Sequence, residues 1–442
     1  MEPGARGSRR GRVWAAVVVG LALVALGHLC AAHGGDFRAF YDAGEAALRH
    51  GDVYAQGPRM RMNVFYAPTF SLIVMPLTLL PPYLAAWIWY LLKLAAVAFL
   101  ARWVYEAVRA EAPDQPPRAR AACVALPFVV ALNPVMSDFR LGQANLFVLL
   151  FTVLAVRSLE RRRPVRGALY FSLAAVKITP LALLPWLVLR RQWRFFGGLL
   201  LVGAAWLAAL AAWWGPARVP ELFREWVRVT ATRKAVPEIV AFFENQSLQG
   251  VAARLARLLP ALEQPLLGVA AYQWIWIVGC AAICAVLVLA AARDRFRPAL
   301  PTEEFALASL LMLLASSDSR WAHHVQLLVP LAVLAALSAR VRLLESWPAA
   351  RRLLAPDTRA KDVAGEEARP LRRWLAALFG AGIVVLVVLG RDVVGPTVNH
   401  AVRTLSLHTA FDLALVVFLA RRLLRRIPAD GVERPVSSLS AA

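Results

Sequence analysis

Residues 273–292 read QWIWIVGCAAICAVLVLAAA, a run of twenty positions without a charged side chain. An α-helix needs about 20 such residues to cross the hydrocarbon core of a bilayer. Other long apolar runs occupy residues 13–32, 83–105 and 374–390. The whole chain has 442 residues and is 60% hydrophobic and only 18% charged, whereas soluble domains average about 25% charged residues. The sequence therefore predicts an all-α protein that crosses the membrane several times.

The net charge of +22 would suggest a nucleic-acid partner in a soluble chain. Here the arginines lie in short segments beside the apolar runs, as the positive-inside rule requires of cytoplasmic segments. No basic and aromatic interleaving and no known binding module accompanies the charge, so we expect no nucleic acid as a partner. The clusters are Arg6, Arg9, Arg10 and Arg12; Arg161 to Arg163; Arg190, Arg191 and Arg194; Arg293, Arg295 and Arg297; and Arg421, Arg422, Arg425 and Arg426.

The four cysteines, Cys30, Cys123, Cys280 and Cys284, lie inside or at the edges of apolar runs. They form no CxxC motif and have no metal-ligand spacing, so they are interpreted as small buried hydrophobic residues. The basic start followed by an apolar run raises the alternative of a cleaved signal peptide. Because no clear small-x-small cleavage site precedes Gly34, we expect an uncleaved first helix.

If the arginine clusters are cytoplasmic, the run at 13–32 leads outward to a polar outer segment at 33–65. Residues 66–82 are apolar but short and interrupted by prolines, which predicts a half-span or re-entrant element lining a cavity. Helix 83–105 then returns inward and 121–134 leads out. An outer turn follows at Met136 to Gln143, and 144–158 leads in.

Residues 166–189 have the length of a span, yet they contain Lys177-Ile178-Thr179-Pro180 at their middle. A charge at the centre of a bilayer costs about 3 kcal/mol or more, and Pro180 removes a helix hydrogen bond. Both features are accommodated by two short helices that form a V with Lys177 at its apex.

Beyond this break, helix 195–213 leads to an outer segment at 214–265, and helices follow at 268–292, 302–316, 325–339, 374–390 and 406–420. We expect a bundle of about 11 to 13 transmembrane or re-entrant helices. The expected organisation is a membrane core at 1–340, a polar cytoplasmic loop at 341–373, a C-terminal helix pair at 374–420 and a cytoplasmic tail at 421–442.

Asp36 follows the first apolar run within the segment Gly-Gly-Asp-Phe-Arg-Ala-Phe-Tyr. A carboxylate at the outer end of a helix can accept a proton from a hydroxyl nucleophile during group transfer. The alternative role is an N-cap for a helix over residues 37–49. The spacing alone leaves both roles open.

Two further positions carry candidate groups. Lys177 can neutralise a phosphate as a point charge, or it can extend to the membrane interface. His323 and His324 are adjacent and point to different sides of a helix, so joint metal ligation by both is not expected. One of them can handle a proton while the other caps a helix or faces water.

Several segments, taken in order, resemble the polyprenol-phosphate-dependent glycosyltransferases of family 87, which have the GT-C membrane fold. They cover about residues 13–340 and are fairly specific only as a set. These segments are Asp36-Phe37-Arg38-Ala39-Phe40-Tyr41 and Gly51-Asp52-Val53-Tyr54; Phe65-Tyr66-Ala67-Pro68; Gly142-Gln143-Ala144-Asn145; Lys177-Ile178-Thr179-Pro180; Asn245-Gln246-Ser247-Leu248; and Trp321-Ala322-His323-His324.

The resemblance implies an enzyme that transfers one sugar, mannose by preference, from a polyprenyl-phosphate donor to a hydroxyl of a glycolipid or glycan. It implies that Asp36 is the general base and that Lys177 meets the donor phosphate. His323, His324, Gln143 and Asn245 become candidates for donor or acceptor binding. At Ser317 to Trp321 the chain departs from the family pattern Ser-Pro-x-Ser-Trp. We expect no cofactor and no obligatory metal, since no exposed DxD motif occurs.

The resemblance also implies a multi-pass plasma-membrane protein with its active site on the extracytoplasmic side, in contact with membrane lipid. The main alternative is a transporter or flippase for a lipid-linked substrate, which would share broken helices and buried charges. No inverted repeat is evident in the sequence, and the polar motifs fall on one face, which favours the enzyme. A scaffold without catalysis remains a third interpretation.

Overall fold

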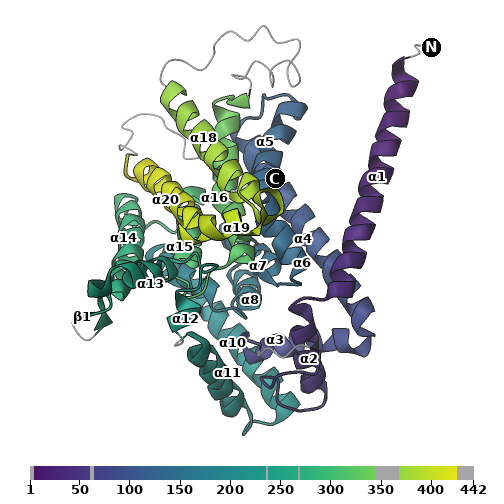
Figure 1. Cartoon of the computed structure of the whole chain (residues 1–442), viewed down its shortest axis with the longest axis vertical. Coiled ribbons are helices and arrows are strands. Elements are labelled where there is room, and N and C mark those ends of the chain that lie inside the picture. Colours follow the sequence, from purple (N-terminus) through teal and green to yellow (C-terminus); the bar gives the residue numbers. More distant parts are fainter. Residues whose placement is uncertain (1–3, 60–63, 235–236, 267–268, 345–367, 426–442) are drawn as a thin grey trace.

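The computed structural model describes residues 4–59, 64–234, 237–266, 269–344 and 368–425. Within these ranges the chain is almost entirely helical (Figure 1). A single antiparallel pair of two-residue strands, β1 (Pro265–Leu266) and β2 (Val269–Ala270), is the exception in the described ranges. Most of the expected loop at 341–373 and of the expected tail at 421–442 lies outside these residues.

The helices follow the apolar runs and the proline positions of the sequence. In the first half they are α1 (Gly4–His33), α2 (Phe37–Leu48), α3 (Pro68–Val74), η1 (Met75–Leu79), α4 (Pro82–Glu111), α5 (Pro117–Val130), α6 (Leu132–Arg140), α7 (Asn145–Glu160), α8 (Pro164–Ala174), η2 (Thr179–Leu183), α9 (Leu184–Leu189) and α10 (Trp193–Trp214). In the second half they are α11 (Val219–Lys234), α12 (Pro237–Val240), α13 (Leu248–Leu258), η3 (Pro260–Leu262), α14 (Ala271–Arg293), α15 (Thr302–Leu314), η4 (Trp321–Leu327), α16 (Leu328–Arg340), α18 (Ala368–Ile383), η6 (Val384–Val388), α19 (Arg391–Thr404) and α20 (Leu407–Arg425).

Five helical segments in the described residues are long and apolar enough to cross a membrane. The number rises to eight when each of three bent helix pairs is taken as one broken span, by length and composition. The bends are 58° between α1 and α2, 57° between α5 and α6, and 55° between α19 and α20. The chain is therefore an all-α, multi-pass membrane protein, as predicted.

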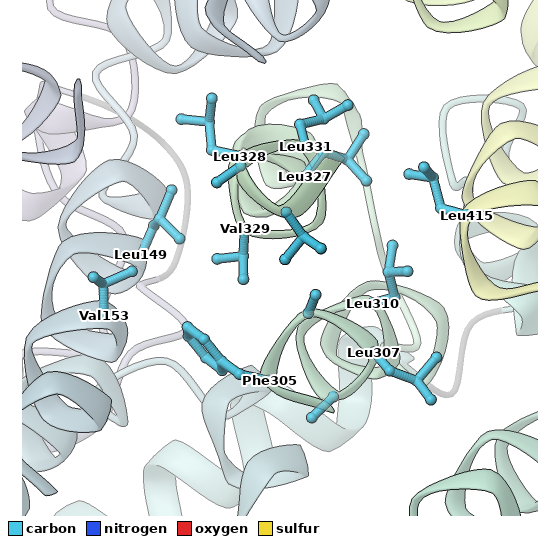
Figure 2. Packing of buried hydrophobic residues seen from close by; sticks show 14 of the residues in the cluster. Leu149, Val153, Phe305, Leu307, Leu310, Leu327, Leu328, Val329, Leu331 and Leu415 are labelled. Carbon is cyan, nitrogen blue, oxygen red and sulfur yellow. The ribbon is translucent and has the colours of Figure 1, made fainter. Parts of the chain in front are cut away.

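The centre of the bundle is formed by α15 and α16, whose side chains are buried on every face. In the span 321–340, 94% of the apolar window is buried, against 22% in α10 and in α14. Figure 2 shows Leu328 and Leu331 of α16 packed between α7 on one side and Leu415 of α20 on the other. A helix that is apolar all round belongs in such a centre, and the outer helices present their apolar faces to lipid.

Ion pairs hold the arginine-rich ends of several helices together. Arg190 pairs with Glu304 at the start of α15 and, at 2.9 Å, with Asp294. Arg422 of α20 pairs with Glu303 at 2.7 Å. The structure thus gathers three of the predicted arginine clusters at one end of the bundle.

The polar segments predicted to lie outside also meet one another. The indole of Trp213, at the end of α10, donates to the carbonyl of Ala47 at 2.8 Å, and its ring stacks on His50. Trp226 of α11 donates to the carbonyl of Phe65 at 3.3 Å. Figure 1 shows α2, α3 and α11 close together at the lower end of the molecule.

The predicted break near Lys177 is confirmed, because α8 ends at Ala174 and η2 begins at Thr179. The short, interrupted element at 66–82 is also confirmed, as α3 followed by η1. The predicted outer turn at Met136 to Gln143 is wrong over most of its length, because α6 continues to Arg140. Pro134 lies in the first turn of α6, where proline is tolerated, so the chain bends there and stays helical.

Candidate active site

Two glycines place Asp36 against a loop that lies far away in the sequence. Gly34 and Gly35 have φ values of 69° and 48°, which favour glycine. A Cβ on Gly35 would lie 2.4 Å from the backbone of Leu141, so only glycine allows this close approach. The backbone N–H of Asp36 donates to the carbonyl of Leu141 at 2.7 Å. The segment after α1 is therefore held against the loop that precedes α7.

The Asp36 side chain is held by the same loop. The side-chain amide of Gln143 donates a hydrogen bond to Oδ2 of Asp36. Asp36 precedes α2, but its side chain makes no capping hydrogen bond, and its φ and ψ of −67° and −17° are already helical. The N-cap interpretation therefore has no support in the geometry, and the carboxylate is turned toward Gln143.

Lys177 lies in the break between α8 and η2. Its Nζ donates to Oδ1 of Asn145 at 2.5 Å and lies 5.8 Å from the ring centroid of Tyr66. The carbonyl of Val176 accepts from the N–H of Ala67 at 2.8 Å, which fixes the break against the start of α3. Gln143 and Asn145 are two residues apart, so one short segment holds both Asp36 and Lys177.

A buried ion pair supports the segment that contains Gln143 and Asn145. Lys93 of α4 lies 2.8 Å from Oδ1 of Asp138, and both side chains are about 1% exposed or less. The other oxygen of Asp138 accepts from the N–H of Asn145 at 3.0 Å. Trp89, one turn before Lys93 on the same face of α4, donates to the carbonyl of Gly142 at 3.1 Å. The loop that carries Gln143 is thus fixed on two sides.

Aromatic rings form an apolar wall beside the carboxylate and the lysine. The ring of Tyr66 stacks on that of Phe70, with 4.4 Å between the ring centroids, and meets that of Phe40 edge-on, with 5.1 Å between the centroids. The hydroxyl of Tyr54, in the outer segment, donates to the carbonyl of Tyr66 at 3.1 Å. Burial, with a further contribution from Asp52, raises the pKa of Tyr54, so this hydroxyl stays protonated and remains a donor.

The two histidines have different surroundings, as adjacent positions on a helix predict. Nδ1 of His323 accepts from the N–H of Arg320 at 2.8 Å and so caps η4. His324 is buried, with Nε2 3.2 Å from Asp412 of α20 and Nδ1 3.1 Å from the carbonyl of Arg320. His324 is therefore the histidine that lies inside the bundle.

Asn245 is fully buried and bonds to backbone groups through both side-chain atoms. Its Oδ1 accepts from Ser319 at 2.9 Å and Ser247 at 3.2 Å, and its Nδ2 donates to Ser317 at 2.8 Å and Val240 at 2.9 Å. The amide thus clamps the segment before Trp321 in place. Its predicted contact with donor or acceptor would have to coexist with this role.

The structure divides the predicted residues into two neighbouring groups. Asp36, Gln143 and Lys177 lie together. His323 and His324 lie in η4, and Asn245 holds the segment that precedes it. The two groups adjoin, because η4 packs on α6 and α7, the helices that carry Asp138 and Asn145. Asp42, the next acidic residue after Asp36, is paired with Arg59 at 2.5 Å.

Four buried polar residues of the site carried no predicted role. They are Lys93, Asp138, His408 and Asp412, and each has an exposed fraction of 1% or less. The ring centroids of His408 and Trp321 lie 4.4 Å apart in an edge-on contact. All four lie in helices that belong to candidate spans or to bent helix pairs, and an ionisable residue in such a place is by itself a signal of function.

The residues that the structure describes contain no cluster of three or more His, Cys, Asp or Glu side chains arranged to hold a metal ion. The candidate catalytic groups are the Asp36 carboxylate and the Lys177 ammonium, with the amides of Gln143 and Asn145 that hold them. Such a set can remove a proton from a hydroxyl and stabilise an anion.

Comparison with known proteins gives two matches. A model of glycosyltransferase family 87 matches residues 64–317, more than half of the chain. The polyprenol-phosphate-mannose-dependent alpha-(1-2)-phosphatidylinositol mannoside mannosyltransferase of Mycolicibacterium smegmatis is 31% identical over 229 residues. That alignment covers 50% of this chain and 47% of the relative, so the chain aligns with about half the length of the curated relative it matches. No solved structure matches the chain.

The family match includes Gln143, Lys177 and Asn245, whereas Asp36, His323 and His324 lie outside it. The matched residues contain the loop at 141–145 and the break at 175–178, the two places where the chain holds its candidate carboxylate and its candidate cation. On this match, the chain belongs to glycosyltransferase family 87.

Proposed function

We propose that this protein transfers one sugar, mannose by preference, from a polyprenyl-phosphate donor to a hydroxyl group of a glycolipid or glycan at the outer face of the membrane. One observation carries the proposal: Gln143 and Asn145, in one short segment, hold the Asp36 carboxylate and the Lys177 ammonium. The printed name of the relative, which includes both a polyprenol-phosphate-mannose donor and a glycolipid acceptor, supports the same assignment. The proposed architecture is a GT-C-type bundle of about 11 to 13 transmembrane or re-entrant helices.

The proposed reaction is a single displacement at the anomeric carbon. The acceptor oxygen forms a bond to this carbon while the bond to the phosphate oxygen breaks, and the lipid phosphate leaves with the electron pair. Asp36 takes the proton of the acceptor hydroxyl. Lys177 stabilises the charge on the leaving phosphate. A single displacement inverts the configuration of the anomeric carbon.

Gln143 has a positioning role in this scheme. Its amide fixes one oxygen of the carboxylate and so sets the plane of the Asp36 side chain. Asn145 accepts a hydrogen bond from the Lys177 ammonium and so fixes its position. His324, buried against Asp412, lies on the helix that packs beside this group and is proposed to contribute to donor or acceptor binding together with His323.

The donor is tested with the purified full-length protein in nanodiscs and a panel of synthetic polyprenyl-phosphate sugars. We expect transfer from the mannose donor to a mannoside acceptor at least about tenfold faster than from glucose or arabinose donors, since loss of even one hydrogen bond to a sugar hydroxyl costs a factor of this order. Mass analysis of the product measures the transfer.

A nucleotide-linked mannose supplied without any lipid donor is the matched control and should give no product. Movement of the lipid-linked sugar across the bilayer without transfer from any donor would replace the enzyme with the transporter or flippase alternative.

The proposed orientation places residues 33–65 and 214–265 outside and the arginine-rich ends inside. In a variant without its four native cysteines, single cysteines at Arg49 and Arg224 should react with an impermeant maleimide added to intact cells, because both side chains are exposed. A cysteine at Arg162, which is equally exposed, should react only after the cells are opened. Labelling of Arg162→Cys alone in intact cells would invert the orientation and place Asp36 on the cytoplasmic side.

A further inference from the structure

The segment α19 (Arg391–Thr404) runs crosswise in the bundle, between η6 and α20 (Figure 1). It is kinked at Gly395, whose φ of 77° is not helical. It is bent by 55° from α20, so it does not continue that span. Val393, Val398 and Leu405 are 63%, 47% and 70% exposed, beside the charged side chains of Arg391 and Asp392. Apolar residues exposed next to charged ones are typical of a helix that lies in the membrane interface.

A cavity of about 470 Å³ opens beside this helix. Phe243 forms one wall, and Arg391, Thr397, His400 and Arg403 of α19 contribute to the other. Its lining contains two arginines and a histidine but no acidic side chain. The volume is in the range of small-molecule sites, and the polar groups that line it are donors suited to an anion.

The two arginines differ in what they already bind. Arg391 has no ion pair or side-chain hydrogen bond with any residue in the described part of the chain. Arg403 is 13% exposed, donates to Glu244 at 2.8 Å and lies 4.9 Å from the ring centroid of Trp321. Glu244 therefore offsets one of the two charges, and the cavity keeps an excess of positive charge around the Arg391 guanidinium.

Contacts connect this cavity to the proposed active site. Arg140, at the end of α6, pairs with Asp392 of α19 at 2.8 Å. The residues directly after Arg140 are those that hold Asp36. Trp321, beneath Arg403, begins the helix that carries His324. The cavity thus lies at the same end of the bundle as Asp36.

We propose that this cavity binds the phosphodiester of an anionic glycolipid acceptor, and so makes such a lipid, rather than a neutral glycan, the substrate that delivers its hydroxyl to Asp36. The inference rests on the proposed function and specifies its acceptor. The guanidinium of Arg391 provides a planar pair of donors that match phosphate oxygens. Because the donor phosphate is assigned to Lys177, the two phosphates of the reaction occupy separate cationic sites.

The position of α19 fits a lipid ligand. A helix in the interface brings Arg391 to the depth of lipid phosphates, with the exposed valines in the acyl region. The sugar of the bound lipid then extends from the cavity toward the loop at 141–143. The ring centroids of Phe243 and His400 lie 4.2 Å apart. Phe243 provides an apolar surface for the ring carbons of the headgroup.

The binding test uses full-length protein in neutral detergent and two short-chain probes, dioctanoyl phosphatidylinositol and dioctanoyl glycerol. Wild-type protein should bind the phosphatidylinositol in preference, and Arg391→Gln should weaken that binding about 5- to 20-fold, as expected for loss of a charge-assisted contact that is partly screened by solvent. Arg391→Lys should recover part of the loss. Arg224→Gln, an exposed arginine of α11 at the same end, should bind as wild type does.

The kinetic test compares the KM for the acceptor lipid with the KM for the polyprenyl-phosphate donor in the transfer reaction. With a phosphatidylinositol mannoside as acceptor, Arg391→Gln should raise the acceptor KM by a similar factor and leave the KM for the polyprenyl-phosphate mannose donor as in wild type. A rise in the donor KM instead would assign the cavity to the donor phosphate and overturn the proposal.

Four outcomes of these tests are decisive. Equal binding of both probes by wild type, or wild-type binding of phosphatidylinositol by Arg391→Gln, would overturn the cavity as an anionic-lipid site, whether or not the protein transfers sugar. Selective binding that depends on Arg391, without transfer by wild type from any donor, would overturn the proposed function and the acceptor role together. Selective binding with a raised acceptor KM would support both.

Discussion

Asp36→Asn is expected to leave a folded protein that binds its donor but turns over about 100- to 10,000-fold more slowly than wild type, the range for loss of a general base. Asn has nearly the shape of Asp and can still accept the hydrogen bond from Gln143. It cannot take a proton from an acceptor hydroxyl at neutral pH. The measurement is the initial rate of transfer by purified protein, together with donor binding and thermal unfolding.

The geometry around Asp36 makes this result discriminating. A capping aspartate would tolerate asparagine, and loss of any cap would cost only about 1 kcal/mol of stability. The structure shows no side-chain cap at Asp36, so capping does not account for the position of this carboxylate. Turnover of Asp36→Asn within a few-fold of wild type would rule out the carboxylate as the base.

Asp42→Asn is the matched control, because Asp42 is an acid of the helix α2 that follows Asp36. Asp42 forms an ion pair with Arg59, within the outer segment. Its removal should lower stability by less than the roughly 3–5 kcal/mol lost when a fully buried pair is broken, because the Arg59 side chain is 31% exposed. Folded Asp42→Asn should still turn over at a rate close to that of wild type. A loss of turnover as large as that of Asp36→Asn would show that the assay responds to damage in this segment generally.

Much of the fold follows from the sequence, because membrane spans are set by length and polarity alone. The twenty apolar residues at 273–292 and the Lys177-Pro180 break each determine local structure without reference to the rest of the chain. The prediction of an outer turn at Met136 to Gln143 was wrong because the structure there depends on contacts with the rest of the chain. Whether Pro134 ends a helix or bends it depends on the packing of α6 against η4, which no local pattern encodes.

The candidate site divides along the same line. Asp36 and Lys177 are recognisable as charges placed at helix ends and breaks. Their shared support, through Gln143 and Asn145, depends on contacts between segments far apart in the chain, and so does the pairing of Lys93 with Asp138. No role was predicted for the expected C-terminal helix pair at 374–420. In the structure, Asp412 in this part of the chain lies against the buried ring of His324. Such pairings become visible only when the helices are assembled.

Lys177→Met is expected to weaken binding of the polyprenyl-phosphate donor about 10- to 100-fold. Methionine keeps most of the length of the side chain but removes the charge. A hydrogen bond to a charged group contributes about 1.5–3 kcal/mol, which corresponds to this range of affinity. Lys177→Arg should retain part of the affinity, since it keeps the charge but changes the geometry toward Asn145. A fluorescent polyprenyl phosphate bound to protein in nanodiscs provides the measurement.

Lys93→Met is the appropriate comparison, because Lys93 is the other lysine of the site region and is fully paired with Asp138. Its loss leaves a buried carboxylate without its partner and should lower stability by about 3–5 kcal/mol. The loss at Lys177 should instead appear in donor binding, with thermal unfolding close to that of wild type. If Lys177→Met binds the donor as tightly as wild type, the lysine serves only to hold the break against Asn145. The leaving phosphate would then need a different cation.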